Sequence, residues 1–261
     1  MSSADAVRPS WCAALLAAGR DDAAALRFDG ALTYRELRAQ VRAWSARLAA
    51  AGVGPESSVL FQAGPSFSGL CALLGVWSLG AQVALLDYRL KDAERERCAA
   101  RLRPAFALTA PGERLATFRA ERELTLARLP GAPAPRTPHA LLQFTSGSTG
   151  APKIVGRTAA SLVAELNGFA AAPGWLRAGD TVLILNSLAH SFGLIGGVLS
   201  ALRAGATAAF AASALPRDLA AALERARPSA VFGVPAHFEL LGALPPGALA
   251  GVRLAVNSGQ L

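Results

Sequence analysis

Cysteine is scarce in this chain, which contains only Cys12, Cys71 and Cys98. The three residues are odd in number, lie far apart and lack metal-binding spacing, so neither a disulfide framework nor a zinc site is expected. Cysteine usage of this kind is typical of a reducing compartment, and we expect a cytoplasmic protein with no metal site of its own. Cys71 lies in an apolar run and is expected to be a small core residue.

Lysine is scarcer still, because Lys91 and Lys153 are the only two and every other basic residue is arginine. The formal net charge of +8 indicates a basic surface, yet the arginines are scattered and no run of five basic residues occurs. Nucleic-acid-binding proteins usually cluster their charge and carry a recognisable module. We therefore expect no nucleic-acid partner, although some arginines could face an anionic substrate.

Long apolar segments suited to a membrane are also lacking. Residues 57–86 and 181–202 contain no charged side chain, but glycine, proline and polar residues divide both into strand-sized and helix-sized pieces. A buried βαβ unit explains these stretches better than a membrane span. Residues 1–10 lack the basic patch and apolar core of a signal peptide.

The composition that remains, 52% apolar and 17% charged over 261 residues, is that of a globular protein with a large core. Thr33 and Glu36 form a capping box that opens a helix, which Gly52 ends. Strands and helices then alternate, which favours an α/β fold of mostly parallel sheets flanked by helices. We expect strands at 59–63, 82–86, 106–109, 140–144, 181–185, 207–210, 230–234 and 253–256, and helices at 66–78, 91–102, 159–169, 193–203 and 217–226.

Four prolines stand within residues 130–138, a density that neither a helix nor a central strand tolerates. We interpret this stretch as an exposed connector between two lobes of one domain, residues 1–129 and 139–261. No internal repeat is evident in the sequence.

The segment richest in chemistry is Phe-Thr-Ser-Gly-Ser-Thr-Gly-Ala-Pro-Lys, residues 144–153. Glycines let successive backbone N–H groups turn inward as an anion nest, and hydroxyl groups add donors that rotate toward phosphate oxygens. Lys153 adds a mobile positive charge, so the loop suits a triphosphate. The candidate phosphate ligands are Thr145, Ser146, Gly147, Ser148, Thr149, Gly150 and Lys153.

Two alternatives exist for this loop, a common P-loop and a polar turn without a ligand. The P-loop of common NTPases requires Gly-Lys-Ser/Thr, whereas here Pro152 precedes the lysine and no hydroxyl residue follows it. A flexible polar turn with no ligand is the plainer alternative, since short Ser/Thr/Gly loops are common.

The ten-residue string closely resembles the signature loop of the adenylate-forming superfamily, which includes acyl-CoA synthetases, aryl-acid ligases, luciferases and peptide-synthetase adenylation domains. Other segments resemble further landmarks of this superfamily, in family order and over nearly the whole chain. These segments are 32–37, 52–55, 77–87, 186–193, 203–207 and 254–261.

The resemblance implies a reaction of the acyl-CoA synthetase type. A carboxylic acid would react with ATP and Mg²⁺ to give an acyl-adenylate and pyrophosphate, and the acyl group would pass to the thiol of coenzyme A or of a carrier protein's phosphopantetheine. The loop would hold the β- and γ-phosphates, and the acyl pocket would contain His190, Phe192, Gly193, Ser258 and Gly259. His190 is expected to form a pocket wall rather than act as a base, because carboxylates are already ionised at pH 7. No aspartate stands in this segment to pair an α-ammonium group, which favours an aryl or fatty acid over an amino acid.

Departures from the family pattern matter equally. Such enzymes are roughly twice this length, usually as two domains. The family's adenine-binding segment, ribose-binding aspartate and C-terminal domain with its catalytic lysine are not in this sequence, and 154–158 lacks a histidine often found there. We expect an incomplete N-terminal domain that alone does not complete acyl-CoA synthesis, with no catalytic residue assignable. The alternative is a non-catalytic lobe that binds nucleotide weakly or only a protein partner.

Overall fold

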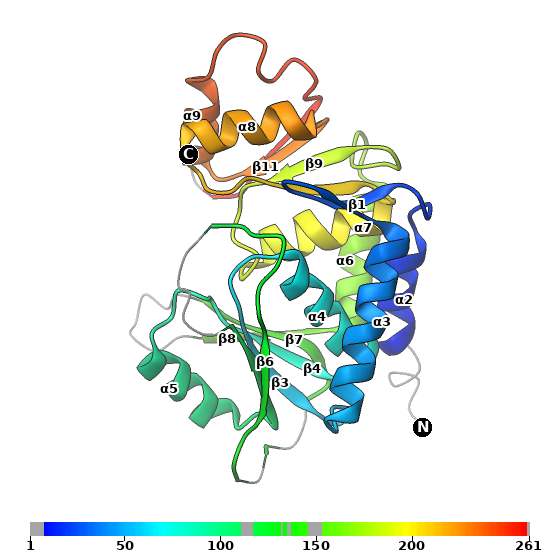
Figure 1. Cartoon of the computed structure of the whole chain (residues 1–261), viewed down its shortest axis with the longest axis vertical. Coiled ribbons are helices and arrows are strands. Elements are labelled where there is room, and N and C mark those ends of the chain that lie inside the picture. Colours follow the sequence, from blue (N-terminus) through cyan, green and yellow to red (C-terminus); the bar gives the residue numbers. More distant parts are fainter. Residues whose placement is uncertain (1–7, 111–116, 132, 135–136, 146–152, 260–261) are drawn as a thin grey trace. The chain divides into compact units, whose positions relative to one another are not determined.

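The computed structural model describes residues 8–110, 117–131, 133–134, 137–145 and 153–259 (Figure 1). The chain divides into two compact units. The first unit comprises Met1–Ala13, Ala39–Ala116 and Glu121–Val163, and the second comprises Ala14–Arg38, Thr117–Ala120 and Ala164–Leu261. Each unit contains a six-stranded sheet, so the predicted α/β architecture is confirmed.

The sheet of the first unit has the strand order β6-β5-β3-β4-β7-β8. Strands β5, β3, β4 and β7 are mutually parallel, whereas β6 and β8 are antiparallel edge strands. Helix α4 (Phe67–Ser78) connects β3 to β4, and α5 (Asp92–Leu102) connects β4 to β5. The strands are β3 (Ser58–Gln62), β4 (Gln82–Leu85), β5 (Phe106–Thr109), β6 (Thr125–Arg128), β7 (His139–Thr145) and β8 (Lys153–Thr158).

The core of this unit contains most of helix α4, whose residues 67–77 are all buried. Ser66 caps α4 by accepting a hydrogen bond from the Gly69 N–H at 3.0 Å, as expected for a helix that begins after a serine. Trp77 is fully buried, and its indole N–H donates to the Ala140 carbonyl at 3.0 Å. Cys71 is buried, as predicted.

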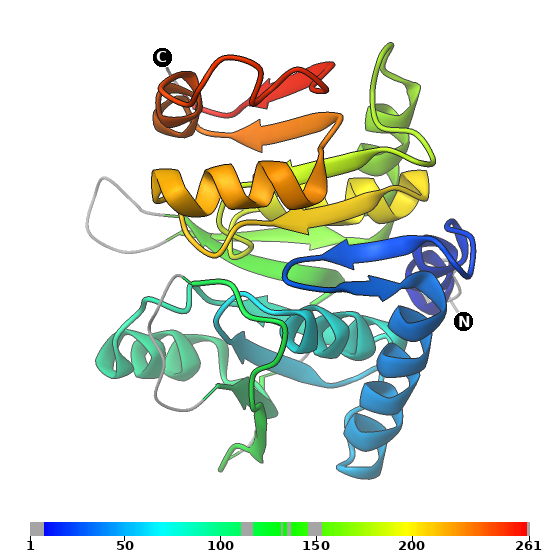
Figure 2. The ribbon, with the colours of Figure 1, turned by 45° about the horizontal axis from the view of Figure 1, so that its top comes forward.

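The sheet of the second unit has the order β12-β11-β9-β10-β1-β2, and the strands lie side by side in that order in Figure 2. All neighbours are parallel except the β1–β2 hairpin. The strands are β1 (Ala24–Arg27), β2 (Ala31–Thr33), β9 (Thr181–Ile184), β10 (Thr207–Phe210), β11 (Ala230–Gly233) and β12 (Leu254–Asn257). The helices within this unit are η1 (Phe192–Leu199), α7 (Ser200–Ala204), α8 (Pro216–Ala226) and α9 (Pro235–Gly242).

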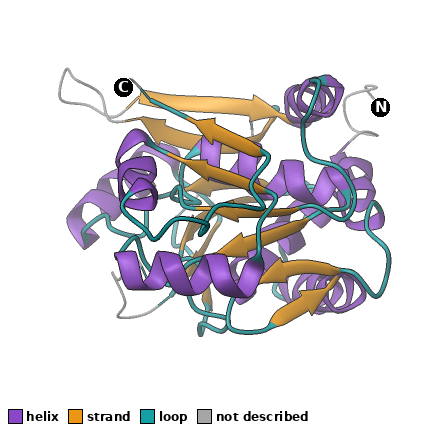
Figure 3. Ribbon diagram, turned by 90° about the horizontal axis from the view of Figure 1, so that it is seen from above, coloured by secondary structure: helices purple, strands orange, loops and turns teal. Residues whose placement is uncertain are grey.

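Three further helices, α2 (Arg8–Ala17), α3 (Tyr34–Ala50) and α6 (Ala159–Ala171), contain residues of both units. Helices run alongside the strands (Figure 3). The predicted capping box opens α3: the Thr33 N–H donates to Glu36 Oε2 at 2.8 Å, and the Glu36 N–H donates to Thr33 Oγ1 at 3.2 Å. Within the described residues no helix has the length and apolar character needed to cross a membrane.

The structure reveals a repeat that the sequence did not. In each unit a strand, a helix, a second strand, a helix and a third strand follow one another, and the third strand lies beside the first on the side away from the second. Thus β5-β3-β4 in the first unit corresponds to β11-β9-β10 in the second. The boundary expected at 130–138 differs from the division into units, because β7 pairs with β4 of the earlier segment.

The two units also share the backbone conformation of the residue that follows the second helix of the repeat. Helix α5 ends on Arg103 (φ 44°) and α8 ends on Arg227 (φ 42°), both left-handed, and a proline follows each. These are the only described non-glycine residues with positive φ. A left-handed backbone costs an L-residue about 1–2 kcal/mol, which glycine avoids.

We therefore expect Arg103→Gly and Arg227→Gly each to raise the free energy of unfolding by about 0.5–1 kcal/mol, after the added flexibility of the unfolded chain is allowed for. Urea unfolding followed by circular dichroism measures the change. Arg97→Gly, at an exposed position inside α5, is the matched control and should lower stability by about 1 kcal/mol. A loss of stability at all three positions would contradict the strain argument.

Candidate functional site

The predicted phosphate loop connects an antiparallel hairpin in the first unit. Thr145 ends β7 and stands opposite Lys153, which begins β8. Ser146, Gly147, Ser148, Thr149 and Gly150 lie outside the described residues. Lys153 was expected as a mobile charge at the end of a loop, but its backbone belongs to a strand. The register of the β7–β8 hairpin therefore fixes the position of the Lys153 backbone opposite Thr145.

The core of the first unit anchors this hairpin. Phe144 and Ile154 pack against the buried cluster that contains Leu60, Ala84 and Leu142. Side chains alternate along a strand, so Lys153 lies on the face opposite Ile154, where it is exposed. Because β7 continues the parallel sheet beside β4, the loop leaves from the carboxyl edge, where α/β sheets generally bind ligands.

The five predicted acid-pocket residues lie at the carboxyl edge of the second sheet. His190, Phe192 and Gly193 follow β9, whereas Ser258 and Gly259 follow β12. Strand β11 lies between β9 and β12, and all three strands are parallel. The structure thus brings both predicted segments to one edge, although Gly193 and Ser258 are 65 positions apart in the sequence.

Contacts with β11 hold both segments in place. The Phe192 ring stacks on Phe232, with centroids 5.6 Å apart and ring planes 22° apart. The Ser258 N–H donates to the Gly233 carbonyl at 3.1 Å. The His190 carbonyl accepts from the Leu194 N–H at 3.0 Å, while the residue itself is exposed. Gly259 is exposed and has φ +120°, a conformation that favours glycine.

Gly193 has a backbone role that its assignment to the acid pocket did not anticipate. A Cβ at this position would overlap the Ser187 carbonyl oxygen and come within 2.9 Å of the Asn186 carbonyl oxygen. The helix predicted at 193–203 is present, and residues 192–199 of it form a π-helix, a rare form found frequently at functional sites. Glycine therefore lets the first turn of η1 approach the segment that follows β9.

The same segment contains a polar group that sequence reasoning did not single out. The side-chain oxygen Oδ1 of Asn186 is buried and has no hydrogen-bond partner within the described residues. A buried unpaired acceptor is costly, and functional sites are among the places where it is tolerated. Such a feature depends on packing, so no sequence signal could have revealed it beyond the Asn186–Gly193 segment itself.

A polar cluster fixes the amino end of β12, the strand that leads to Ser258. The Asp180 carboxylate accepts from Ser229 Oγ at 2.7 Å and from the Arg177 N–H at 2.8 Å, and it pairs with Arg253. Arg253 also donates to the Gly174 and Trp175 carbonyls. Burial alone would raise the pKa of Asp180, but the hydrogen bonds from Ser229 and Arg253 outweigh it and hold the pKa below its ordinary value.

Asp180→Asn is expected to lower the free energy of unfolding by about 2 kcal/mol at pH 7. Because the folded pKa lies below the unfolded one, the ionised form's stabilisation is complete above the unfolded pKa and is lost as pH falls through the folded pKa. Urea midpoints measured from pH 7 to pH 3 should therefore converge for the two proteins at the acid end. Asp29→Asn, in an exposed pair with Arg225, should change stability by about 0.5 kcal/mol or less. A pH-independent difference would contradict this linkage.

Metal-binding side chains do not gather at either edge. Across the described ranges, no group of three or more His, Cys, Asp or Glu residues could hold a metal ion.

Many known proteins are similar to the chain, and the following three are examples. A 3,4-dihydroxybenzoate–[aryl-carrier protein] ligase of Bacillus anthracis is 27% identical over 107 residues, which are 41% of this chain and 26% of that ligase. The crystal structure of CmiS6 superposes with a TM-score of 0.78 at 26% identity, covering 96% of this chain and 65% of that one. The o-succinylbenzoate coenzyme A synthetase of Bacillus subtilis, solved with AMP, has a TM-score of 0.77 at 21% identity, covering 95% and 67%.

The chain thus spans about two thirds of the length of these two structures. The model of one protein family, AMP-binding enzyme, matches residues 15–260. This match covers both sheets and every predicted site residue, and the chain belongs to the AMP-binding enzyme family.

Proposed function

We propose that this chain carries the phosphate-binding and acid-binding parts of an AMP-forming acid–thiol ligase. The observation that carries the proposal is the β7–β8 hairpin, whose hydroxyl- and glycine-rich connection leaves the carboxyl edge of a parallel sheet with Lys153 at its return. Membership of the AMP-binding enzyme family supports the same reaction class.

The chemistry requires charge neutralisation. ATP and a carboxylate are both anions, so attack at the α-phosphate proceeds only if aimed donors offset their repulsion. The hydroxyl and N–H groups of 145–150, with the Lys153 ammonium, would hold the β- and γ-phosphates that leave as pyrophosphate. Mg²⁺ bound to the same phosphates would supply Lewis acidity.

The acid would bind at the carboxyl edge of the second sheet. Phe192 is half-buried and stacks on the fully buried Phe232 of β11, so it gives the edge one aromatic side chain. His190, Phe192 and Gly193 would form one side of the pocket, and Ser258 and Gly259 the other. The lack of a carboxylate at residues 186–193 favours an aryl or fatty acid over an amino acid.

The acyl acceptor would be a thiol, either that of coenzyme A or that of phosphopantetheine on an acyl carrier protein. The Bacillus anthracis relative is described as a ligase of an aryl-carrier protein, which favours testing a carrier first. Mechanistically, both acceptors present the same thiol to the same acyl-adenylate.

Acid-dependent ATP–pyrophosphate exchange tests the proposal, using aryl acids, fatty acids and amino acids with a version of the protein extended by the family's adenine-binding, ribose-binding and C-terminal elements, which are not in this sequence. Exchange is expected with an aryl or fatty acid and not with amino acids. Saturable binding of MgATP without exchange for any acid would instead support the second candidate, a nucleotide-binding module without catalysis. Absence of both binding and exchange would contradict both functions.

A further inference from the structure

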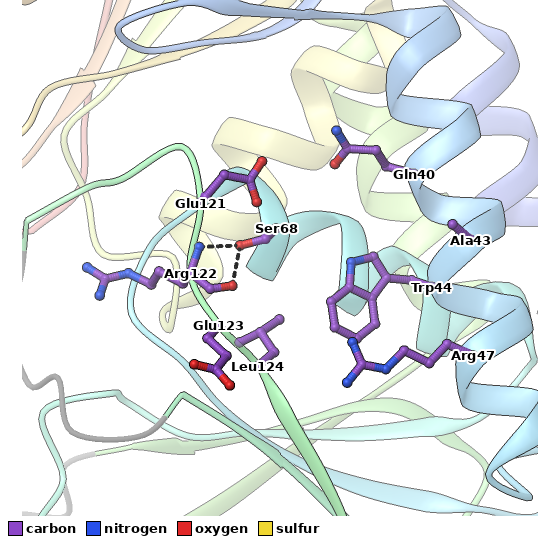
Figure 4. Close-up of a pocket in the computed structure, with 9 residues that line it drawn as sticks. All are labelled: Gln40, Ala43, Trp44, Arg47, Ser68, Glu121, Arg122, Glu123 and Leu124. Carbon is purple, nitrogen blue, oxygen red and sulfur yellow. Dashed lines mark hydrogen bonds between the residues drawn. The ribbon is translucent and has the colours of Figure 1, made fainter.

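A cavity of about 480 Å³ lies in the first unit, and every residue that lines it belongs to that unit (Figure 4). Its walls come from α3, from the first turn of α4 and from the segment that leads into β6. The side chains that line it include Gln40, Trp44, Arg47, Ser68, Glu121 and Leu124. None of them is among the residues predicted for phosphate or acid binding. The volume falls in the range of small-molecule pockets.

The position of this cavity in the fold is where an α/β sheet presents a ligand site. From β3 the chain crosses to β4 on one side and then to β5 on the other, so the connections diverge between β3 and β5. Ser68 lies in the connection after β3, and 121–124 lie in the connection after β5. Ligands of open parallel sheets bind at such switch points, outside the carboxyl ends of the strands.

The wall at the switch point is preformed. The Ser68 hydroxyl donates to the Arg122 carbonyl at 3.1 Å and accepts from the Arg122 N–H at 2.8 Å. These two hydrogen bonds, drawn in Figure 4, join the 121–124 segment to α4. On the α3 wall, Gln40 Oε1 accepts from Cys71 Sγ at 3.3 Å, which leaves the amide N–H groups of Gln40 for another acceptor.

Two opposite charges line the cavity without neutralising each other. The Arg47 guanidinium lies over the Trp44 ring, 4.8 Å from its centroid, and has no carboxylate partner within the described residues. The Glu121 carboxylate likewise has no hydrogen bond or ion pair there. Figure 4 shows Glu121 and Arg47 on different sides of the space beside the indole ring.

We propose that this cavity is a second ligand site, which binds a small amphoteric molecule with an apolar body. Its ammonium group faces Glu121, its carboxylate faces Arg47, and its apolar body packs on Trp44 and Leu124. Both residues are exposed, so a molecule with both charges can pair with both side chains at once, whereas a singly charged molecule leaves one of them to water.

Three probes with the same ring test the assignment: L-phenylalanine, 3-phenylpropanoate and 2-phenylethylamine. The readout is the indole N–H signal of Trp44 in ¹⁵N–¹H spectra, which is identified by its loss in Trp44→Phe. L-Phenylalanine should shift this signal saturably, and Glu121→Gln and Arg47→Gln should each weaken its binding about three- to fivefold. The amine should respond only to Glu121→Gln, and 3-phenylpropanoate only to Arg47→Gln.

Matched controls separate the site from general charge effects. Arg42→Gln changes an exposed arginine of the same helix that does not line the cavity, and Glu56→Gln changes an exposed glutamate of the same unit. Both should leave binding unchanged. The proposal is overturned if L-phenylalanine gives no saturable shift, if all three probes bind alike in every variant, or if the control variants weaken binding as much as the site variants.

Discussion

Gly193→Ala is expected to lower the free energy of unfolding by about 2–3 kcal/mol, the usual cost of overpacking a site that cannot yield. The added methyl group would meet the Ser187 and Asn186 carbonyl oxygens, which belong to the backbone and cannot rotate away. Relief requires moving η1 away from the segment that follows β9. Urea unfolding followed by far-ultraviolet circular dichroism measures the loss.

Gly168→Ala is the matched control, because Gly168 lies inside α6 and a Cβ there would meet nothing within 4 Å. Alanine is the better helix former, so this variant should be more stable by about 0.5–1 kcal/mol. Opposite signs at the two positions are the expected result. Equal changes would show that close packing does not explain the glycine at 193.

In the extended protein used for the exchange assay, Lys153→Ala is expected to lower kcat/KM for ATP by about 10- to 100-fold in acid-dependent pyrophosphate exchange. A charge-assisted contact to phosphate contributes about 1.5–3 kcal/mol, and alanine removes it entirely. The midpoint of thermal unfolding should barely move, because the lysine is exposed and its strand is anchored by Ile154 on the other face.

Lys91→Ala provides the matched control, since Lys91 is the only other lysine and is exposed at the start of α5. It should change neither kinetics nor stability. Unchanged kinetics in Lys153→Ala would reject a phosphate role for that lysine. Equal collapse of folding and activity would make Lys153 structural, and phosphate binding would then depend on the hydroxyl groups of Thr145, Ser146, Ser148 and Thr149.

The central strands could be predicted from the sequence because their apolar residues match the buried positions that they occupy in the sheets. Strands β3, β4, β5 and β10 are short apolar runs, and each was placed to within one residue of its bounds. Buried parallel strands are apolar on both faces, so a continuous run without alternation is their natural signature.

Peripheral elements were missed for a physical reason. Strand β8 begins directly after the phosphate loop and alternates exposed with half-buried residues, so it resembled a continuation of the loop. Strand β1 pairs with β10, and the partners Leu26 and Ala208 are far apart in the sequence. No local pattern encodes such a contact, and the helices α2 and α9 were missed as well.

The candidate site shows the same division. The hydroxyl and glycine residues of the loop led to its prediction as a phosphate site. The predicted acid-pocket residues lie at one edge because β9, β11 and β12 are parallel and each segment follows one of these strands. The contact of Gly193 with 186–187, the unpaired Asn186 oxygen and the cavity beside Trp44 depend on side chains that meet only in the folded chain.

The two units differ in the length of their first crossover, and the difference lies beside the predicted acid pocket. From the start of β3 to the start of β4 the numbering advances from 58 to 82, whereas from β9 to β10 it advances from 181 to 207. A π-helix takes up extra residues as a wider turn, and η1 does so where Phe192 begins it. One residue corresponds to about 100° of rotation along an α-helix. Shortening η1 by one residue would therefore rotate His190 and Phe192 relative to Leu199, Ala201 and Leu202, which lie in the core. The length of this helix would thus alter the surface of the predicted acid pocket and leave the interior in place.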